Sequence, residues 1–131
     1  MQNIQKKLVE HGVRPTIHRI HIAHYLLNEA DHPTADDVLV WAKENLPKVS
    51  RATVYNTLRE LSQAGLIREF QFPQISKTVY DKNTKNHFHF YDQSSDSFLD
   101  LGSESVKVDL QLPPSFNVNS VDLLVSGNRS T

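Results

Sequence analysis

Two histidines in the sequence His-Phe-His, His87 and His89, are the residues best placed to bind a metal ion. In an extended strand, alternate side chains point to the same face, so both imidazoles would project from one face, about 7 Å apart along the chain. Asp100 lies in the next segment of alternating apolar residues, where a hairpin would bring it opposite the pair. Asp81, at the end of a predicted strand, and His32, on a predicted turn, would add a second carboxylate and a third imidazole.

The sequence contains no cysteine, so any metal must be held by nitrogen and oxygen atoms. Imidazole together with carboxylate suits divalent iron, manganese and zinc, whereas the absence of thiolate argues against a tight structural zinc site. An ordinary interpretation also exists: a His-x-His pair is often simply packed or exposed, Asp81 suits a turn and His32 suits a loop. Spacing alone leaves the choice open. His18 and His21 have no carboxylate nearby in the sequence, and we interpret them as polar or DNA-facing positions.

A second candidate function lies in the segment SRATVYNTLRELSQAG, which predicts a helix capped by Ser50. Val54, Leu58 and Leu61 recur at three- and four-residue spacing and form its buried face. Arginine and asparagine on the outer side can make paired hydrogen bonds to base edges, and hydroxyls near the helix start suit phosphates. The predicted DNA-contacting residues are Arg14, Arg19, Ser50, Arg51, Thr53, Tyr55, Asn56, Arg59 and Lys77. A solvated surface helix carries similar residues, so this helix alone does not decide the function.

The elements around that helix follow the order of a winged helix-turn-helix. Residues 2–11 predict a short amphipathic helix, Thr16 caps a second helix, and Thr34 caps a third. The apolar surface of the second helix is predicted to come from Ile17, Ile20, Ala23, Tyr25 and Leu27. Period-two alternation then predicts strands at 66–72 and 77–80, joined by a turn, and at 87–91, 97–101 and 116–125. Residues 104–112 fit either a strand or a short helix.

The predicted fold class is therefore α+β, with a winged-helix domain over residues 1–81, including a hinge, and a small second domain over 82–131. The 131 residues include 38% hydrophobic and 22% charged residues and carry a net charge of -1. This charge does not by itself indicate nucleic-acid binding, and the modest core favours completion by dimerisation. No apolar run approaches the ~18 residues that span a bilayer, and no signal-peptide core is present, so we expect a cytoplasmic protein.

The blocks GVRPTIHRI, HPTADDV, SRATVYNTLRELSQAGLI, HFHF and FLDL resemble the ferric-uptake-regulator (Fur) family over nearly the whole chain. The resemblance implies a dimeric, metal-sensing bacterial repressor with a winged helix, a hinge and an α/β dimerisation domain. The sequence is most similar to the peroxide-sensing (PerR) branch, whose regulatory metal is bound by three His and two Asp. The matching positions are His32, Asp81, His87, His89 and Asp100. The last is Asp in peroxide sensors and usually Glu in iron sensors.

The function implied by this resemblance is binding to operator DNA, expected to be palindromic, when Fe(II) or Mn(II) is bound; Zn(II) could replace them in vitro. Peroxide reacting with the iron form would oxidise His32 or His87, weaken metal binding and release the DNA. The manganese form would not respond. No catalytic residues are expected, because the protein would be a regulator and not an enzyme.

Two departures from the family are visible. Asp92-Gln93-Ser94-Ser95 occupies the region of the first Cys-x-x-Cys motif and the second motif is absent, so no structural cysteine zinc is expected and the dimer would rest on apolar packing. Residues 104–115 look too short for the usual helix. The alternatives are a metal-responsive uptake repressor of the same family without peroxide sensing, a small non-haem iron enzyme, and a winged-helix protein without metal.

Overall fold

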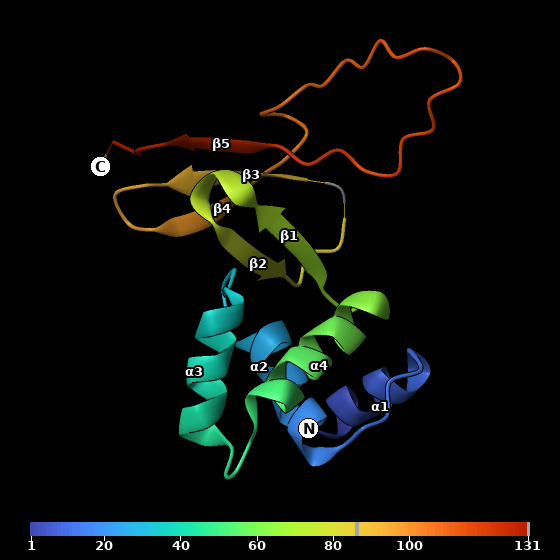
Figure 1. The fold of residues 1–131 in the computed structure, drawn as a ribbon, viewed down its shortest axis with the longest axis vertical. Helices are drawn as coiled ribbons and strands as arrows, with labels where there is room; N and C mark the ends of the chain where they lie inside the picture. The colour runs from blue at the N-terminus through green and yellow to red at the C-terminus, as the bar shows by residue number, and fades with distance from the viewer. Residues whose placement is uncertain (86, 131) are drawn as a thin grey trace. The chain divides into compact units, whose positions relative to one another are not determined.

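The computed structural model describes residues 1–85 and 87–130 and divides into two compact units, Met1–Thr84 and Lys85–Thr131. Within the described residues, the N-terminal unit holds four α-helices and a two-stranded sheet, and the C-terminal unit holds a three-stranded sheet (Figure 1). The predicted α+β class is confirmed. The predicted domains, 1–81 and 82–131, stay a prediction. No helix in the described part of the chain is long and apolar enough to cross a membrane.

Side-chain caps begin three of the helices. The helices are α1 (Gln2–Glu10), α2 (Ile17–Asn28), α3 (Ala35–Asn45) and α4 (Arg51–Gln63). The hydroxyl oxygens of Thr16, Thr34 and Ser50 accept hydrogen bonds from the backbone N–H groups three residues further on, at 3.3, 3.1 and 3.1 Å. Each bond satisfies an N–H group that has no partner within its helix, so the three predicted caps are confirmed.

The helices of the N-terminal unit share one apolar core. Val54, Leu58 and Leu61 of α4 are buried in it, as predicted. The prediction for α2 is wrong for Ile17, which is 73% exposed. The buried residues of α2 are Ile22, Ala23 and Leu26, with Ile20, Tyr25 and Leu27 packed at the margin of the core. Apolar residues occur on more than one side of α2, so periodicity alone does not identify the buried face.

A hairpin follows α4 and forms the wing. Gly65, with a φ of 79°, ends the helix in the left-handed conformation that favours glycine. The strands β1 (Arg68–Phe72) and β2 (Lys77–Asp81) pair in antiparallel fashion and are joined by the short helix η1 (Pro73–Ile75). Both strands match the predicted hairpin. Helices followed by such a hairpin constitute the winged helix-turn-helix expected from the sequence.

Strand β2 also anchors the loop between α2 and α3. Thr34 forms an isolated antiparallel bridge with Val79. The N–H of Tyr80 donates to the carbonyl of Pro33 at 2.9 Å. These two backbone links hold the residues that precede α3 against the end of β2.

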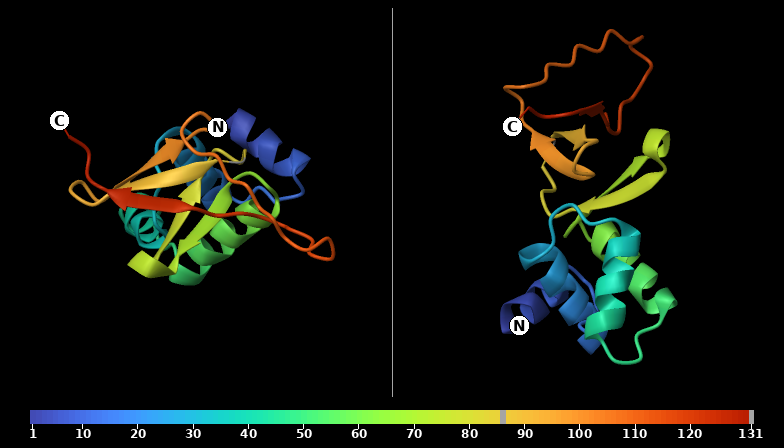
Figure 2. Two further views of the ribbon diagram at one scale, coloured as in Figure 1. Left: turned by 90° about the horizontal axis from the view of Figure 1, so that it is seen from above. Right: turned by 90° about the vertical axis from the view of Figure 1, so that its left-hand side faces the viewer.

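The C-terminal unit is a three-stranded sheet in the order β4-β3-β5. Strand β3 (Phe88–Asp92) pairs in antiparallel fashion with β4 (Ser97–Leu101), and β5 (Leu124–Gly127) lies on its other side, parallel to it (Figure 2). Both strands of the hairpin predicted here are present. Its register sets His89 opposite Asp100, the pairing that the metal prediction requires.

The segment between β4 and β5, residues 102–123, forms a long loop without helix or strand (Figure 1). The strand predicted over 116–125 begins only at Leu124, because alternating apolar residues specify a strand only where a neighbouring strand can pair with them. Five large apolar side chains of the loop are exposed: Val108, Leu110, Leu112, Phe116 and Val118. Among the described residues of the C-terminal unit, only Phe98 is a buried apolar side chain.

Candidate metal centre and nucleic-acid interface

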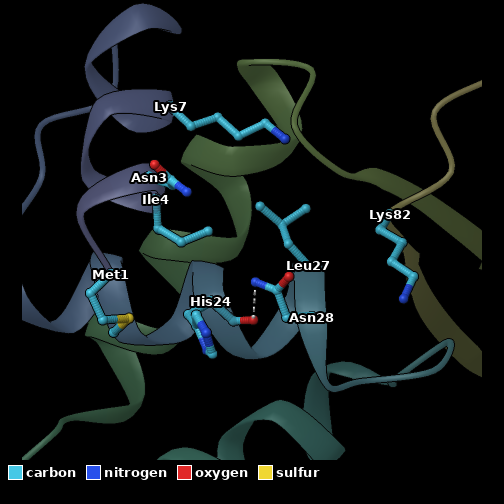
Figure 3. A pocket seen from close by; sticks show the side chains of 8 residues that line it. All are labelled: Met1, Asn3, Ile4, Lys7, His24, Leu27, Asn28 and Lys82. Carbon is cyan, nitrogen blue, oxygen red and sulfur yellow. Dashed lines mark hydrogen bonds between the residues drawn. The ribbon is translucent and has the colours of Figure 1, made fainter.

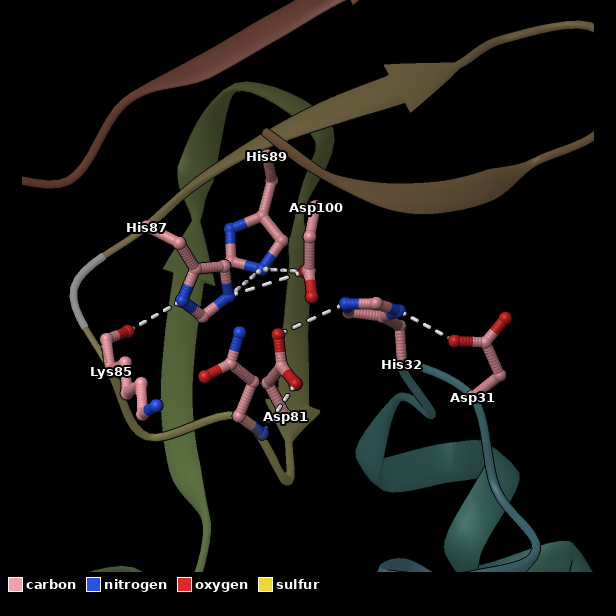
Figure 4. Close-up of polar contacts among 8 residues, drawn as sticks. Asp31, His32, Asp81, Lys85, His87, His89 and Asp100 are labelled. Carbon is pink, nitrogen blue, oxygen red and sulfur yellow. Dashed lines mark hydrogen bonds and ion pairs between the residues drawn. The ribbon is translucent and has the colours of Figure 1, made fainter. Parts of the chain in front are cut away.

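His32 is held between two carboxylates in the N-terminal unit. Its Nδ1 lies 2.8 Å from Oδ1 of Asp31, and its Nε2 lies 2.9 Å from Oδ2 of Asp81 (Figure 4). The residue has a φ of 47°, in the left-handed region that residues other than glycine seldom adopt. This conformation costs about 1–2 kcal/mol, so the surrounding contacts must hold it.

Asp81, the last residue of β2, is the buried member of this group, with 4% of its surface exposed. Its Oδ1 accepts the N–H of Asn83 at 2.8 Å, while its Oδ2 faces His32. The links between β2 and the loop before α3 explain how residues 49 positions apart in the sequence come into contact. The structure therefore brings His32 and Asp81 together.

His87, His89 and Asp100 converge in the C-terminal unit. The Nε2 atoms of His87 and His89 lie 3.2 and 3.4 Å from Oδ1 of Asp100 (Figure 4). Both histidines are buried, and their Nε2 atoms lie 3.1 Å apart. His87 directly precedes β3 and His89 is its second residue, and the two imidazoles project from the same face, as predicted.

The donor atoms of His87, His89 and Asp100 fit a divalent metal ion. The Nε2 atoms of His87 and His89 lie at hydrogen-bond distance and can share one proton. A metal cation beside them would instead be bound by the lone pairs of both Nε2 atoms, and the carboxylate of Asp100 would balance its charge. Buried ionisable groups are costly unless they are paired or bound to metal, and only Asp100 among the five predicted ligands is substantially exposed, at 39% of its side chain. Imidazole and carboxylate suit iron, manganese and zinc.

The outer face of α4 carries the predicted base-reading residues as two side-chain pairs. Arg51 donates from Nη2 to the hydroxyl of Tyr55 at 3.4 Å, and its guanidinium carbon lies 4.9 Å from the ring centroid. Arg59 donates from Nη2 to Oδ1 of Asn56. Arg51, Asn56 and Arg59 are exposed, and Tyr55 is half-buried. Contacts of these residues with bases stay a prediction.

The hydroxyl groups of Ser50 and Thr53 lie 2.9 Å apart at the start of α4. Arg19 of α2 donates from Nη1 to the carbonyl of Arg14 at 3.3 Å. These two residues, both predicted to contact DNA, therefore lie close together at the start of α2. Lys77, the first residue of β2, and Tyr55 line the same hollow of about 410 Å³ beside the start of α3. The wing lysine therefore lies close to α4.

A second hollow, of about 490 Å³, was not expected from the sequence (Figure 3). Residues of α1 and α2 line it together with Lys82, which follows β2. Lys7 and Lys82 border it, and none of the residues described in its lining is Asp or Glu.

Asp31 is the residue at the candidate metal centre that sequence reasoning missed. Its carboxylate faces the imidazole nitrogen of His32 that is turned away from Asp81. A carboxylate next to a candidate histidine ligand is a signal that the sequence does contain. The contact between Asp31 and His32 depends on the left-handed backbone conformation of His32, which the pattern of apolar residues does not predict.

The family model described as the ferric uptake regulator family matches residues 10–124 of this chain. The chain belongs to this family. Its membership accounts for the order of elements, in which four helices and a wing precede a small sheet with His89 on its central strand.

Two curated proteins match part of the chain. The chain is 38% identical over 94 residues to the peroxide operon regulator of Bacillus subtilis (strain 168), covering 72% of this chain and 64% of that protein. It is 34% identical over 90 residues to the peroxide-responsive repressor PerR of Staphylococcus aureus (strain USA300), covering 69% of this chain and 60% of that protein. The matched part thus spans less than two thirds of the length of either relative.

A solved family member shares the fold. The crystal structure of the Vibrio cholerae ferric uptake regulator matches with a TM-score of 0.71 and 18% sequence identity. The match covers 95% of this chain and 98% of that one, so the two chains share the fold over nearly their whole length.

Proposed function

We propose that this member of the ferric uptake regulator family is a dimeric, metal-dependent repressor that peroxide inactivates. In this proposal it binds operator DNA when Fe(II) or Mn(II) is bound, and oxidation of a ligand histidine releases it. The observation that carries the proposal is the convergence of the buried imidazoles of His87 and His89 on Asp100. Mere surface histidines would not be buried beside a carboxylate.

The two donor sets together offer three imidazoles and two carboxylates. We infer from family membership and from the donor types that His32 and Asp81 serve the same divalent ion as the three donors of the C-terminal unit. An ion bound by residues of both units would favour one relative placement of the winged helix and the sheet. Metal binding would then select the conformation that binds DNA.

The peroxide response is supported by the relatives and by one residue type. The two relatives described above are named as peroxide regulators. Asp100 is the residue that the resemblance associates with peroxide sensing. Bound Fe(II) would supply the one-electron chemistry that activates hydrogen peroxide. The ring of His32 or His87 would gain one oxygen atom, with water as the other product, and would then be a poorer ligand.

The proposed partners are a second copy of the chain and double-stranded DNA with a palindromic operator. A two-fold symmetric dimer presents its two winged helices to two half-sites, so protein symmetry and operator symmetry match. This function places the protein in the cytoplasm, where bacterial DNA lies.

The test is DNA binding by the metal-free, Mn(II) and Fe(II) forms at fixed salt, with and without hydrogen peroxide. We expect both metals to promote binding and peroxide to abolish it only in the iron form. Mass spectrometry should then show the gain of one oxygen atom on the peptide carrying His32 or His87. An iron form that stays on DNA with unmodified histidines supports the metal-responsive alternative instead.

His89→Gln provides the matched variant, because it removes a buried donor while keeping a polar side chain of similar reach. His11→Gln, at an exposed position after α1, is the control. We expect His89→Gln to lose metal-promoted DNA binding and His11→Gln to retain it. Equal, metal-independent binding by both variants would show a winged-helix protein without a regulatory metal.

A further inference from the structure

Asp31 stands in an unusual relation to a proposed metal ligand. Its Oδ1 lies 2.8 Å from Nδ1 of His32, the ring nitrogen on the opposite side from the Nε2 that faces Asp81. The His32 side chain is 10% exposed, whereas that of Asp31 is 89% exposed. The acidic residue is therefore not part of the core, and it reaches back from solvent to a largely buried ring (Figure 4).

The position of the proton on a neutral imidazole decides which of its two nitrogens can bind a metal. A neutral ring carries hydrogen on one nitrogen and a lone pair on the other. If His32 is to present the lone pair of Nε2 beside Asp81, its proton must lie on Nδ1. Asp31 is placed to accept that proton in a hydrogen bond. A carboxylate in this position fixes the tautomer, orients the ring and makes the other nitrogen a stronger donor.

His87 shows the same arrangement with a weaker acceptor. Its Nδ1 lies 2.6 Å from the backbone carbonyl of Lys85, and its Nε2 faces Asp100. Both rings thus have an acceptor on Nδ1 and a carboxylate beside Nε2. The carbonyl of Lys85 is neutral, whereas a carboxylate is charged. The hydrogen bond to Asp31 therefore increases the electron density of the His32 ring more than the bond to Lys85 increases that of the His87 ring.

The backbone at His32 adds a second reason for an orienting partner. The residue is in the left-handed region, with a φ of 47°, directly before a proline. A loop in this conformation is retained only if its contacts hold it. Asp31 and Asp81 contact the two ring nitrogens and so fix both the ring and the loop that carries it.

We propose that Asp31 is a positioning residue for the metal centre: it accepts a hydrogen bond from Nδ1–H of His32 and thereby leaves the lone pair of Nε2 to bind the ion. This inference rests on the proposed function, because it takes His32 as a ligand. It assigns to Asp31 a role in metal affinity that does not involve contact with the metal.

Metal affinity measured by competition with a fluorescent chelator provides the first test. We expect Asp31→Ala to weaken Mn(II) binding about tenfold. Removing a hydrogen-bond partner of a metal-binding histidine typically weakens metal binding by about 10- to 100-fold, and the exposure of Asp31 favours the smaller value. Asp31→Asn keeps an acceptor oxygen but no charge, so its affinity should lie between those of wild type and Asp31→Ala. Glu29→Gln removes a nearby carboxylate and should bind Mn(II) as wild type does.

The second test observes the proton itself. In the diamagnetic Zn(II) form of the nitrogen-labelled protein, NMR should show a slowly exchanging Nδ1–H signal of His32, assigned by its loss in His32→Gln. We expect the signal to persist in Asp31→Asn and to disappear in Asp31→Ala. A role confined to loop stability would lower the melting temperature of Asp31→Ala without this selective loss and without rescue by asparagine.

Two results would overturn the inference while leaving the proposed function intact: Asp31→Ala binding Mn(II) as tightly as wild type, or retaining the Nδ1–H signal. Failure of the proposed function has a different signature. In that case the wild-type protein would not bind Mn(II) or Zn(II) at all, or His32→Gln would bind them unchanged.

Discussion

Arg129 donates from Nε to Oδ2 of Asp92 at 3.1 Å and so joins the residues after β5 to the end of β3. Asp92 is 3% exposed, and its Oδ1 accepts from the hydroxyl and the N–H of Ser94 at 2.6 and 3.1 Å. Asp92 begins the stretch that occupies the region of the family's first Cys-x-x-Cys motif. An ion pair and a serine turn thus hold together a part of the sheet for which cysteine-bound zinc is expected elsewhere in the family.

Arg129→Met should make the C-terminal unit more sensitive to acid. Hydrogen bonds from the side chains of Ser94 and Arg129 hold the pKa of Asp92 well below its ordinary value. A carboxyl group with a lowered pKa stabilises the fold at neutral pH, and this stabilisation is lost as the pH falls below about 4 and through the folded-state pKa. Without Arg129 the pKa rises, so acid unfolding begins at a higher pH.

Circular dichroism during an acid titration measures this midpoint. Lys107→Met, which removes an exposed cation of the same unit, is the control and should titrate as wild type does. Coincident curves for Arg129→Met and wild type would show that the ion pair does not stabilise the sheet.

Two serines of the α4 region should respond in opposite directions to replacement by alanine. Ser50 caps the helix, so Ser50→Ala should lower the free energy of unfolding by about 1 kcal/mol. The Oγ of Ser62 is buried without a hydrogen-bond partner among the described residues, so Ser62→Ala should raise it by up to about 1 kcal/mol. Urea unfolding measures both, and a destabilised Ser62→Ala protein would contradict the account of its hydroxyl.

Arg51→Ala and Lys77→Ala should weaken DNA binding in different ways. Arg51 is exposed near the start of α4, where loss of a base contact should cost about 1–3 kcal/mol and relax specificity at one position. Lys77 lies on the wing, where loss of a phosphate contact should weaken binding to all sequences and lower the salt slope by about 1. Fluorescence anisotropy with operator and scrambled duplexes at several salt concentrations separates these effects. Identical losses on both duplexes would remove Arg51 from the base-reading set.

The double variant Leu110→Ser and Leu112→Ser should weaken the proposed dimer. Both side chains are exposed in the single chain, at 49% and 46%, and burial of a leucine contributes about 1.5–3 kcal/mol. We therefore expect the dimer dissociation constant to rise by at least about tenfold, measured by analytical ultracentrifugation. Val40→Ser, an exposed apolar position on α3, is the control. An unchanged dimer would place the interface elsewhere.

Local signals made much of the fold predictable. The hydroxyl caps of α2, α3 and α4 depend on residues three positions apart, so the sequence contains both partners of each bond. The alternation of apolar and polar residues that predicts β3 and β4 is likewise local, since each strand has five residues. The hairpin that it predicts sets His89 opposite Asp100, as the structure confirms. Caps and strands of this kind are therefore predictable from the sequence, because the residues that form them lie within a few positions of one another.

The remaining features depend on residues far apart or on backbone conformation. Arg129 and Asp92 are 37 positions apart, and no periodic pattern links them. Asp31 is adjacent to His32 in the sequence. The proposed role of Asp31 depends on the left-handed backbone conformation of His32 and on the contact between the Asp31 carboxylate and the His32 ring. Residues 116–125 alternate as a strand does, but β5 starts only at Leu124 because pairing depends on neighbouring strands.

The nearly coreless C-terminal unit has a consequence for how much protein a cell must make. Among its described residues Phe98 is the one apolar side chain that the single chain buries. If a second copy supplies the missing burial, the stability of this unit depends on protein concentration by mass action. At few copies per cell most chains would then carry an unfolded C-terminal unit that proteases can cleave. Repression would then appear only above a threshold of expression, with gene dosage rather than metal supply setting that lower limit.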